Sequence, residues 1–114
     1  MTINRKHRDY LEDIAREIRK VDQFIKEISF EQFRVDEKTV YAVIRAIEII
    51  GEASKKVPDE IKQNQPTIPW REISGMRDKL VHDYSGVNLT IVWKTATEDL
   101  PEIEPIILEL LSHY

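Results

Sequence analysis

The chain has 114 residues, of which 41% are hydrophobic and 33% are charged, so its size and composition are those of one soluble globular domain, residues 1–114. Its net charge of −4 argues against sequence-independent binding to duplex DNA, because such binding requires a basic surface. The chain has no cysteine, no apolar run of about 18 residues and no apolar leader after Met1, so we expect a cytoplasmic protein without disulfides, thiolate metal sites or membrane contact.

The first half of the chain has the apolar periodicity of helices. Apolar residues recur every three or four positions from about residue 5 to 29, which predicts a long amphipathic helix. Ser29 followed by Gln32 is typical of a capping box, and it predicts a short helical turn through Phe33. Asp36 is expected to cap a second long helix over residues 37–56, which the Val-Pro pair at 57–58 ends.

The second half is predicted to be helical as well. A short turn is expected after Pro58, and a third helix from Trp70 to Tyr84 follows a proline-rich loop. Asn88 is expected to cap a last helix that continues to about Ser112 and kinks at Pro101. No segment has the pattern of a strand. The sequence therefore predicts an all-α, up-and-down bundle of four main helices plus short helical turns.

Three polar residues near the end of the third helix form the candidate site: Arg77, His82 and Tyr84. A histidine can move protons, and an arginine can stabilise the charge that builds on phosphorus, so this pair can cleave RNA without a metal. We find no ligand cluster for a metal and no motif for a cofactor, and we expect neither. Tyr84 lies on the apolar stripe at the helix end. A tyrosine there can also be a core residue whose ring packs inside the bundle and whose hydroxyl reaches water.

The positions of the pair on the helix leave other interpretations open. Arg77 lies about 40° from Ile73 on the apolar stripe, so its head either reaches water or pairs with Glu48 or Glu52 of the second long helix. His82 lies about 140° around the helix from Arg77. The two converge only if the helix loosens or if a second subunit supplies its own copies.

A carboxylate accompanies the histidine. Asp78 precedes His82 by four residues and shares its face of the helix, where it can orient the imidazole and favour its charged form. A cationic histidine that only interacts with the C-terminal end of the helix dipole is an alternative.

Several segments together resemble a known family. The sequence is similar to the HepT family of HEPN-domain toxins, small all-α ribonucleases that pair with a minimal (MNT-type) nucleotidyltransferase antitoxin. The resemblance covers nearly the whole chain, and it is clearest in residues 10–14, 45–53, 68–73, 75–84, 92–93 and 99–101.

The resemblance implies a role for each site residue. Arg77 and His82 match the catalytic pair, Tyr84 matches the tyrosine two residues beyond the histidine, and Asp78 takes the place of the polar residue after the arginine. Glu48 is expected to support the site as a neighbouring carboxylate. The resemblance also implies a HEPN-like fold, an RNA substrate, a homodimer whose two motifs face one cleft, and an antitoxin that silences the nuclease by transferring AMP from ATP to Tyr84.

Two other functions stay open at this point. The chain can be a non-catalytic helical module that holds substrate or ATP for a nucleotidyltransferase partner, or a plain helical dimerisation protein. A neighbouring reading frame for a small nucleotidyltransferase fits the toxin and the non-catalytic module, but it does not fit the plain dimerisation protein. Growth arrest on expression alone, relieved by changing His82, distinguishes the toxin from the non-catalytic module.

Overall fold

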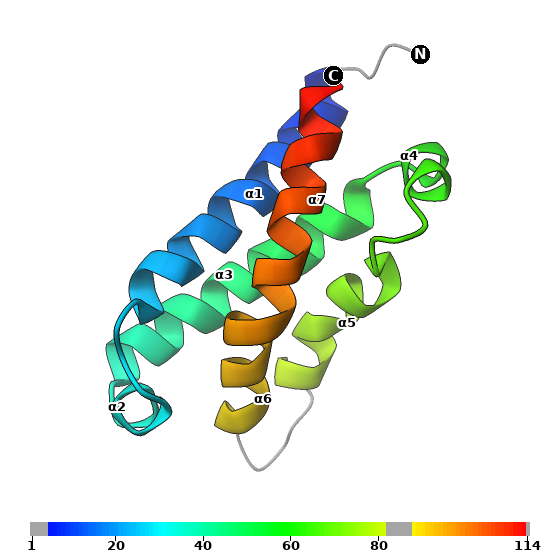
Figure 1. The fold of residues 1–114 in the computed structure, drawn as a ribbon. Coiled ribbons are helices and arrows are strands. Elements are labelled where there is room, and N and C mark those ends of the chain that lie inside the picture. Colours follow the sequence, from blue (N-terminus) through cyan, green and yellow to red (C-terminus); the bar gives the residue numbers. More distant parts are fainter. Residues whose placement is uncertain (1–4, 82–87, 114) are drawn as a thin grey trace.

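The structure, a computed structural model, describes residues 5–81 and 88–113. Within these ranges the chain forms helices and no strands, which confirms the predicted all-α class. Four long helical segments alternate in direction and are joined by short connections (Figure 1). The elements are α1 (Arg5–Ile25), α2 (Phe30–Arg34), α3 (Glu37–Lys56), α4 (Asp59–Asn64), α5 (Trp70–Val81), α6 (Leu89–Lys94), the π-helical turn η1 (Thr95–Asp99) and α7 (Leu100–Ser112).

The two predicted helix starts in the first half of the chain are confirmed. The Gln32 backbone N–H donates to Ser29 Oγ at 3.1 Å, and the Ser29 backbone N–H donates to Gln32 Oε1 at 2.8 Å, which completes the capping box. Asp36 Oδ1 accepts from the Thr39 backbone N–H at 3.2 Å at the start of α3. These bonds satisfy backbone donors that the first turn of a helix leaves unpaired.

The first helix is shorter than predicted. It ends at Ile25 rather than at Ser29, because Glu27 takes a φ of 64° and leaves the right-handed helical region. A left-handed residue is a common way to end a helix, but it is usually glycine. The apolar periodicity continues through Ile28 and gave no sign of this break.

The last helix contains an irregularity that was not predicted. The segment η1 interrupts it between α6 and α7, and the Leu100 backbone N–H donates to the carbonyl of Thr95, five residues earlier. The π-helical turn ends two residues before Pro101, the residue at which we expected a kink. Because Pro101 has no N–H to donate, it cannot continue the regular α-helical pattern of bonds.

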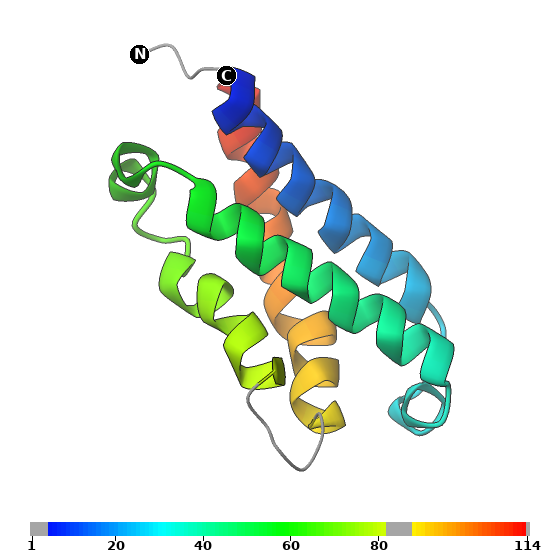
Figure 2. The same ribbon diagram turned by 180° about the vertical axis from the view of Figure 1, so that it is seen from behind.

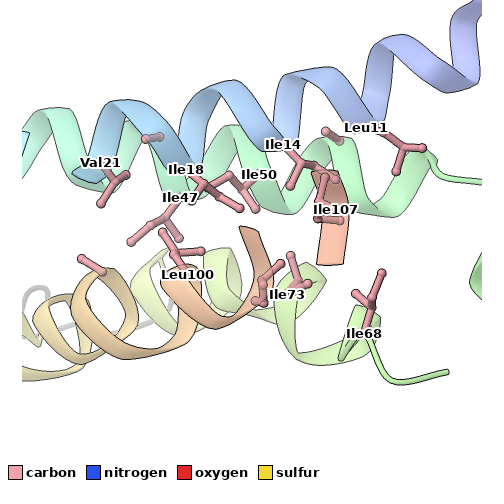
Figure 3. Close-up of a cluster of buried hydrophobic side chains, with 14 of the residues drawn as sticks. Leu11, Ile14, Ile18, Val21, Ile47, Ile50, Ile68, Ile73, Leu100 and Ile107 are labelled. Atoms are coloured by element: carbon pink, nitrogen blue, oxygen red, sulfur yellow. The ribbon is translucent and has the colours of Figure 1, made fainter. Parts of the chain in front are cut away.

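The core is built from the apolar faces of the long helices. Side chains from α1 and α3 meet those from α5 and α7, and Ile68 covers one end (Figure 3). Helix α3 packs against both α1 and α5, and α7 packs against α1. No helix in the described ranges is both long and apolar enough to cross a lipid bilayer. Core residues with at most 1% exposure include Leu11, Ile14, Val21, Ile47, Ile50, Ile73, Leu100 and Ile107.

Candidate functional site

Helix α5 carries the described part of the predicted site, and its first half is firmly held. The Trp70 side chain is buried and its Nε1–H donates to the carbonyl of Gln65 at 3.2 Å. Ile73, one turn further, is 0% exposed. Packing of this kind fixes the direction in which α5 leaves the loop, and therefore the position of the residues that follow.

A contact between small residues joins α5 to α3. Ser54 of α3 is 0% exposed, and its hydroxyl lies 3.0 Å from the hydroxyl of Ser74, so the two share a hydrogen bond. Gly51, one turn earlier in α3, is buried as well. Because the two helices run in opposite directions (Figure 2), the backbone of Arg77 lies opposite the turn of α3 that contains Gly51.

The structure places only some of the predicted site residues. Arg77 lies on α5, and Asp78 beside it is exposed. Glu48 lies half-buried on α3. His82 and Tyr84 lie outside the described residues, so their predicted approach to Arg77 stays a prediction, as does an ion pair of Arg77 with Glu48.

A glycine stands two residues before Arg77. A Cβ atom built on Gly75 meets no atom of the described residues within 4 Å, and the backbone there is not in the left-handed region. Glycine inside a helix destabilises it by about 1 kcal/mol relative to alanine. The described part of the fold therefore does not require glycine at this position.

A groove of about 550 Å³ runs along the other flank of α5. Its floor is Ile47 of α3, one wall is α5 with Met76, and the opposite wall is α6, η1 and α7 with Ile91, Ile103 and Ile106. Close backbone contacts join α3 to α5 and α1 to α7. The groove thus lies between α5 and the last helical segment.

The charged residues of the groove were not predicted to form a site. Glu72, Asp99 and Glu102 contribute three carboxylates and Lys94 one ammonium group. This net negative lining disfavours a phosphate backbone in the groove. Sequence periodicity shows that Asp99 and Glu102 border an apolar stripe. It does not show that these residues and α5 line a common groove.

Within residues 5–81 and 88–113 no three histidine or carboxylate side chains lie close enough together to hold a metal ion.

Comparison with known proteins gives matches over most of the chain. A family model described as "HepT-like: Ribonuclease HepT-like" matches residues 14–110. A protein of Thermococcus cleftensis named "Probable ribonuclease HepT" is 54% identical over 102 residues, which are 90% of this chain and 93% of that protein.

Two further relatives are also similar over most of the chain. Proteins named "Putative RNase" are 45% identical in Caldanaerobacter subterraneus, over 92% of this chain and 94% of the relative, and 44% identical in Methanocaldococcus jannaschii, over 83% of this chain and 82% of the relative. No solved structure matches the chain significantly.

Proposed function

Because the chain belongs to the HepT-like ribonuclease family, we propose that it is the toxin of a toxin–antitoxin pair and cleaves RNA internally, in the cytoplasm, with Arg77 and His82. The expected family and the expected class of enzyme, a ribonuclease, are confirmed. The observation that supports the assignment of residues is that the family match spans 14–110 and so includes Arg77 and the histidine five positions later.

The proposed reaction uses the RNA 2′-hydroxyl as the nucleophile. His82 takes the proton of this hydroxyl as its oxygen attacks the adjacent phosphorus, and a protonated histidine returns a proton to the 5′-oxygen when the P–O5′ bond breaks. Arg77 stabilises the negative charge of the phosphorane. Asp78 orients the imidazole, and Glu48 supports the site from α3. DNA lacks the 2′-hydroxyl and is not a substrate of this chemistry.

The active form is proposed to be a homodimer. Arg77 and His82 are about 140° apart on a regular helix, so one copy presents them in different directions. If two copies pack together through this part of α5, the arginine of one copy can act with the histidine of the other. The partner copy therefore completes the site.

Substitution of the pair tests the reaction. We expect Arg77→Ala and His82→Ala each to lower the rate of RNA cleavage by about 10²–10⁴-fold, because each removes a group that acts in the transition state. Arg19→Ala, on the exposed face of α1, and His113→Ala, at the exposed end of the chain, are matched controls that keep the wild-type rate. The assay uses purified protein, a labelled RNA and an excess of EDTA.

Two outcomes contradict the proposed chemistry. Full activity of His82→Ala removes the histidine from the mechanism. Loss of wild-type activity in EDTA, restored by a divalent cation, replaces the metal-independent route with a metal-assisted one. Circular dichroism of each variant separates a loss of chemistry from a loss of fold.

Regulation is proposed to act through Tyr84. A nucleotidyltransferase antitoxin transfers AMP from ATP to the tyrosine hydroxyl and releases pyrophosphate, which adds about one negative charge and a nucleotide two residues from His82. The added phosphate repels the phosphates of RNA and blocks the site.

Intact-mass spectrometry tests this regulation. After incubation with the partner, ATP and Mg²⁺, we expect added AMP on the wild type and none on Tyr84→Phe, which then escapes silencing. Tyr41→Phe is the matched control, because Tyr41 is 73% exposed on α3 and available to any unselective transferase. Modification of Tyr84→Phe to the same extent as the wild type would remove Tyr84 from the mechanism.

A further inference from the structure

The groove between α5 and the last helical segment has the size and the lining of a ligand pocket. Its volume of about 550 Å³ lies within the range of pockets that hold small molecules, about 300–1,000 Å³. Ile47 and Ile103 line it and are only 1% and 4% exposed, so the groove reaches the side chains of the core. The proposed cleavage of RNA makes no use of this groove.

The charged groups of the groove are not paired with one another. Glu72 lies on α5, Asp99 at the end of η1 and Glu102 on α7. None of the three makes an ion pair among the residues that the structure describes, and neither does Lys94. Unpaired carboxylates beside apolar walls favour a cation, because the low dielectric of the walls strengthens the attraction.

The three carboxylates belong to the same half of the groove. Glu72 precedes Met76 by one turn of α5, and Asp99 and Glu102 follow Ile91 by more than two turns. Helix α5 and the segment from α6 to α7 run in opposite directions (Figures 1 and 2). The groove therefore has an acidic half, with the three carboxylates, and an apolar half, with Met76 and Ile91.

A buried hydroxyl points to a ligand independently of the carboxylates. Thr95 lines the groove and is 7% exposed. Its hydroxyl makes no hydrogen bond among the described residues, whereas that of Thr97 donates to the carbonyl of Trp93. No side-chain nitrogen or oxygen of the described residues is both fully covered and unpaired, so the Thr95 hydroxyl reaches the groove.

The hydroxyl also lies on an unusual stretch of backbone. Thr95 and Asp99 are the two ends of the π-helical turn η1, and both line the groove. Turns of this kind are rare inside helices and occur frequently at functional sites.

We propose that this groove binds an organic cation, a primary amine on an extended apolar body. The ammonium group lies in the acidic half, where it donates hydrogen bonds to the carboxylates and to the Thr95 hydroxyl. The apolar body covers Met76 and Ile91 and displaces water from them. Lys94, one turn beyond Ile91 in α6, repels a second cation in the apolar half and so favours an amine with a single charge.

Other occupants fit the groove less well. The carboxylates are too far apart to hold a metal ion, since no three such groups of the described residues converge, and they repel the phosphates of RNA. A protein surface would cover the rim, where Glu72, Lys94 and Glu102 are all exposed, and burying unpaired charges is costly. Among the described residues, the large apolar side chains that are exposed include only one from the groove, Ile91.

Isothermal titration calorimetry on the full chain, without RNA, tests the site. We expect octylamine, a cation at neutral pH, to bind with a dissociation constant below about 1 mM. Octanol has the same chain without the charge and octanoate has the opposite charge, and both should bind at least about tenfold more weakly. Butylamine keeps the ammonium but should also bind at least about tenfold more weakly, because it buries fewer methylene groups.

Variants locate the bound amine. Glu72→Gln combined with Glu102→Gln should raise the dissociation constant of octylamine about tenfold, because two cation partners are removed. Glu60→Gln combined with Glu98→Gln, at exposed positions outside the groove, is the matched control without effect.

The hydroxyl is tested separately. Thr95→Val should raise the dissociation constant at least about threefold, because it removes the hydroxyl and keeps the shape of the side chain. Thr95→Ser keeps the hydroxyl and should stay within about twofold of the wild type. Circular dichroism checks that the helices are retained in every variant.

Several outcomes overturn the proposal. Equal affinities for octylamine, octanol and octanoate would mean that the carboxylates do not select the ligand. No binding of octylamine at millimolar concentration would mean that the groove is not a site for amines. If the Glu72 and Glu102 variant instead weakens self-association or binding of a nucleotidyltransferase partner, the groove belongs to that protein contact. None of these outcomes bears on the proposed cleavage of RNA, which is measured by its own assay.

Discussion

The two sides of this bundle are built differently. On the side of α1, α3 and α7, core residues such as Leu11, Ile14 and Ile107 are 0% exposed and backbones pack closely. On the side of α5, the helix is joined to α3 by small residues, and a groove of about 550 Å³ lies between it and the last helical segment. The closed side holds the fold together, and the open side leaves surface free for binding.

The largest predicted effect compares one isoleucine from each side. Ile14→Ala should lower the free energy of unfolding by about 2–5 kcal/mol, because it removes buried methyl groups and leaves a cavity. Ile91→Ala should change it by less than about 1 kcal/mol, because Ile91 is 43% exposed. Urea denaturation at low protein concentration measures both without a contribution from dimer formation. Equal losses of the free energy of unfolding in the two variants would mean that both sides contribute similarly to the stability of the fold.

A smaller effect is expected where the open side is attached to the closed one. Ser54→Ala removes the hydrogen bond to Ser74 and should destabilise the protein by about 1 kcal/mol. The double variant with Ser74→Ala should cost less than the sum of the single changes, since both remove the same bond. Ser112→Ala, at the exposed end of α7, is the matched control with almost no effect. Strict additivity of Ser54 and Ser74 would show that the hydroxyl pair does not connect α3 to α5.

The smallest effect concerns the start of α3, the helix that both sides share. A hydrogen bond from the Thr39 side chain, with a second from its backbone N–H, lowers the pKa of Asp36 below its ordinary value. A carboxyl whose pKa is lowered by folding stabilises the folded state above its unfolded pKa, and this contribution is lost as the pH falls through the folded pKa.

Asp36→Asn keeps a capping side chain but cannot titrate. The difference in thermal midpoint between the wild type and this variant should therefore shrink as the pH is lowered from about 6 to about 3. Circular dichroism melts at several pH values measure it. A difference that stays constant with pH would mean that the charge of Asp36 does not contribute to the cap.

Local signals in the sequence were sufficient for much of the fold. Asp36 and the Val-Pro pair at 57–58 bound α3 correctly, and Ser29 with Gln32 located the capping box, because these features depend on neighbours in the chain. The left-handed Glu27 and the π-helical turn were missed, since neither changes the apolar periodicity.

Only part of the candidate site could be predicted from the sequence. Spacing identified Arg77, Asp78 and the residues around them as candidates, because they lie close together on one helix. The groove was missed because it depends on the distance between α5 and α7, which no local pattern encodes. The open environment of Gly75 was missed for the same reason, since it is a property of what surrounds α5.

A hydrogen bond joins the first turn of α1 to the last turn of α7. Arg8 Nη1 donates to the carbonyl of Leu111 at 3.1 Å, whereas α5 ends at Val81 and α6 begins at Leu89 at the opposite pole of the bundle (Figures 1 and 2). A purification tag, a fluorophore or a fused domain added near either of these turns would therefore project from one pole, away from the end of the helix that carries Arg77. A short linker could also join the two turns in a circular permutant, with the chain opened between other helices.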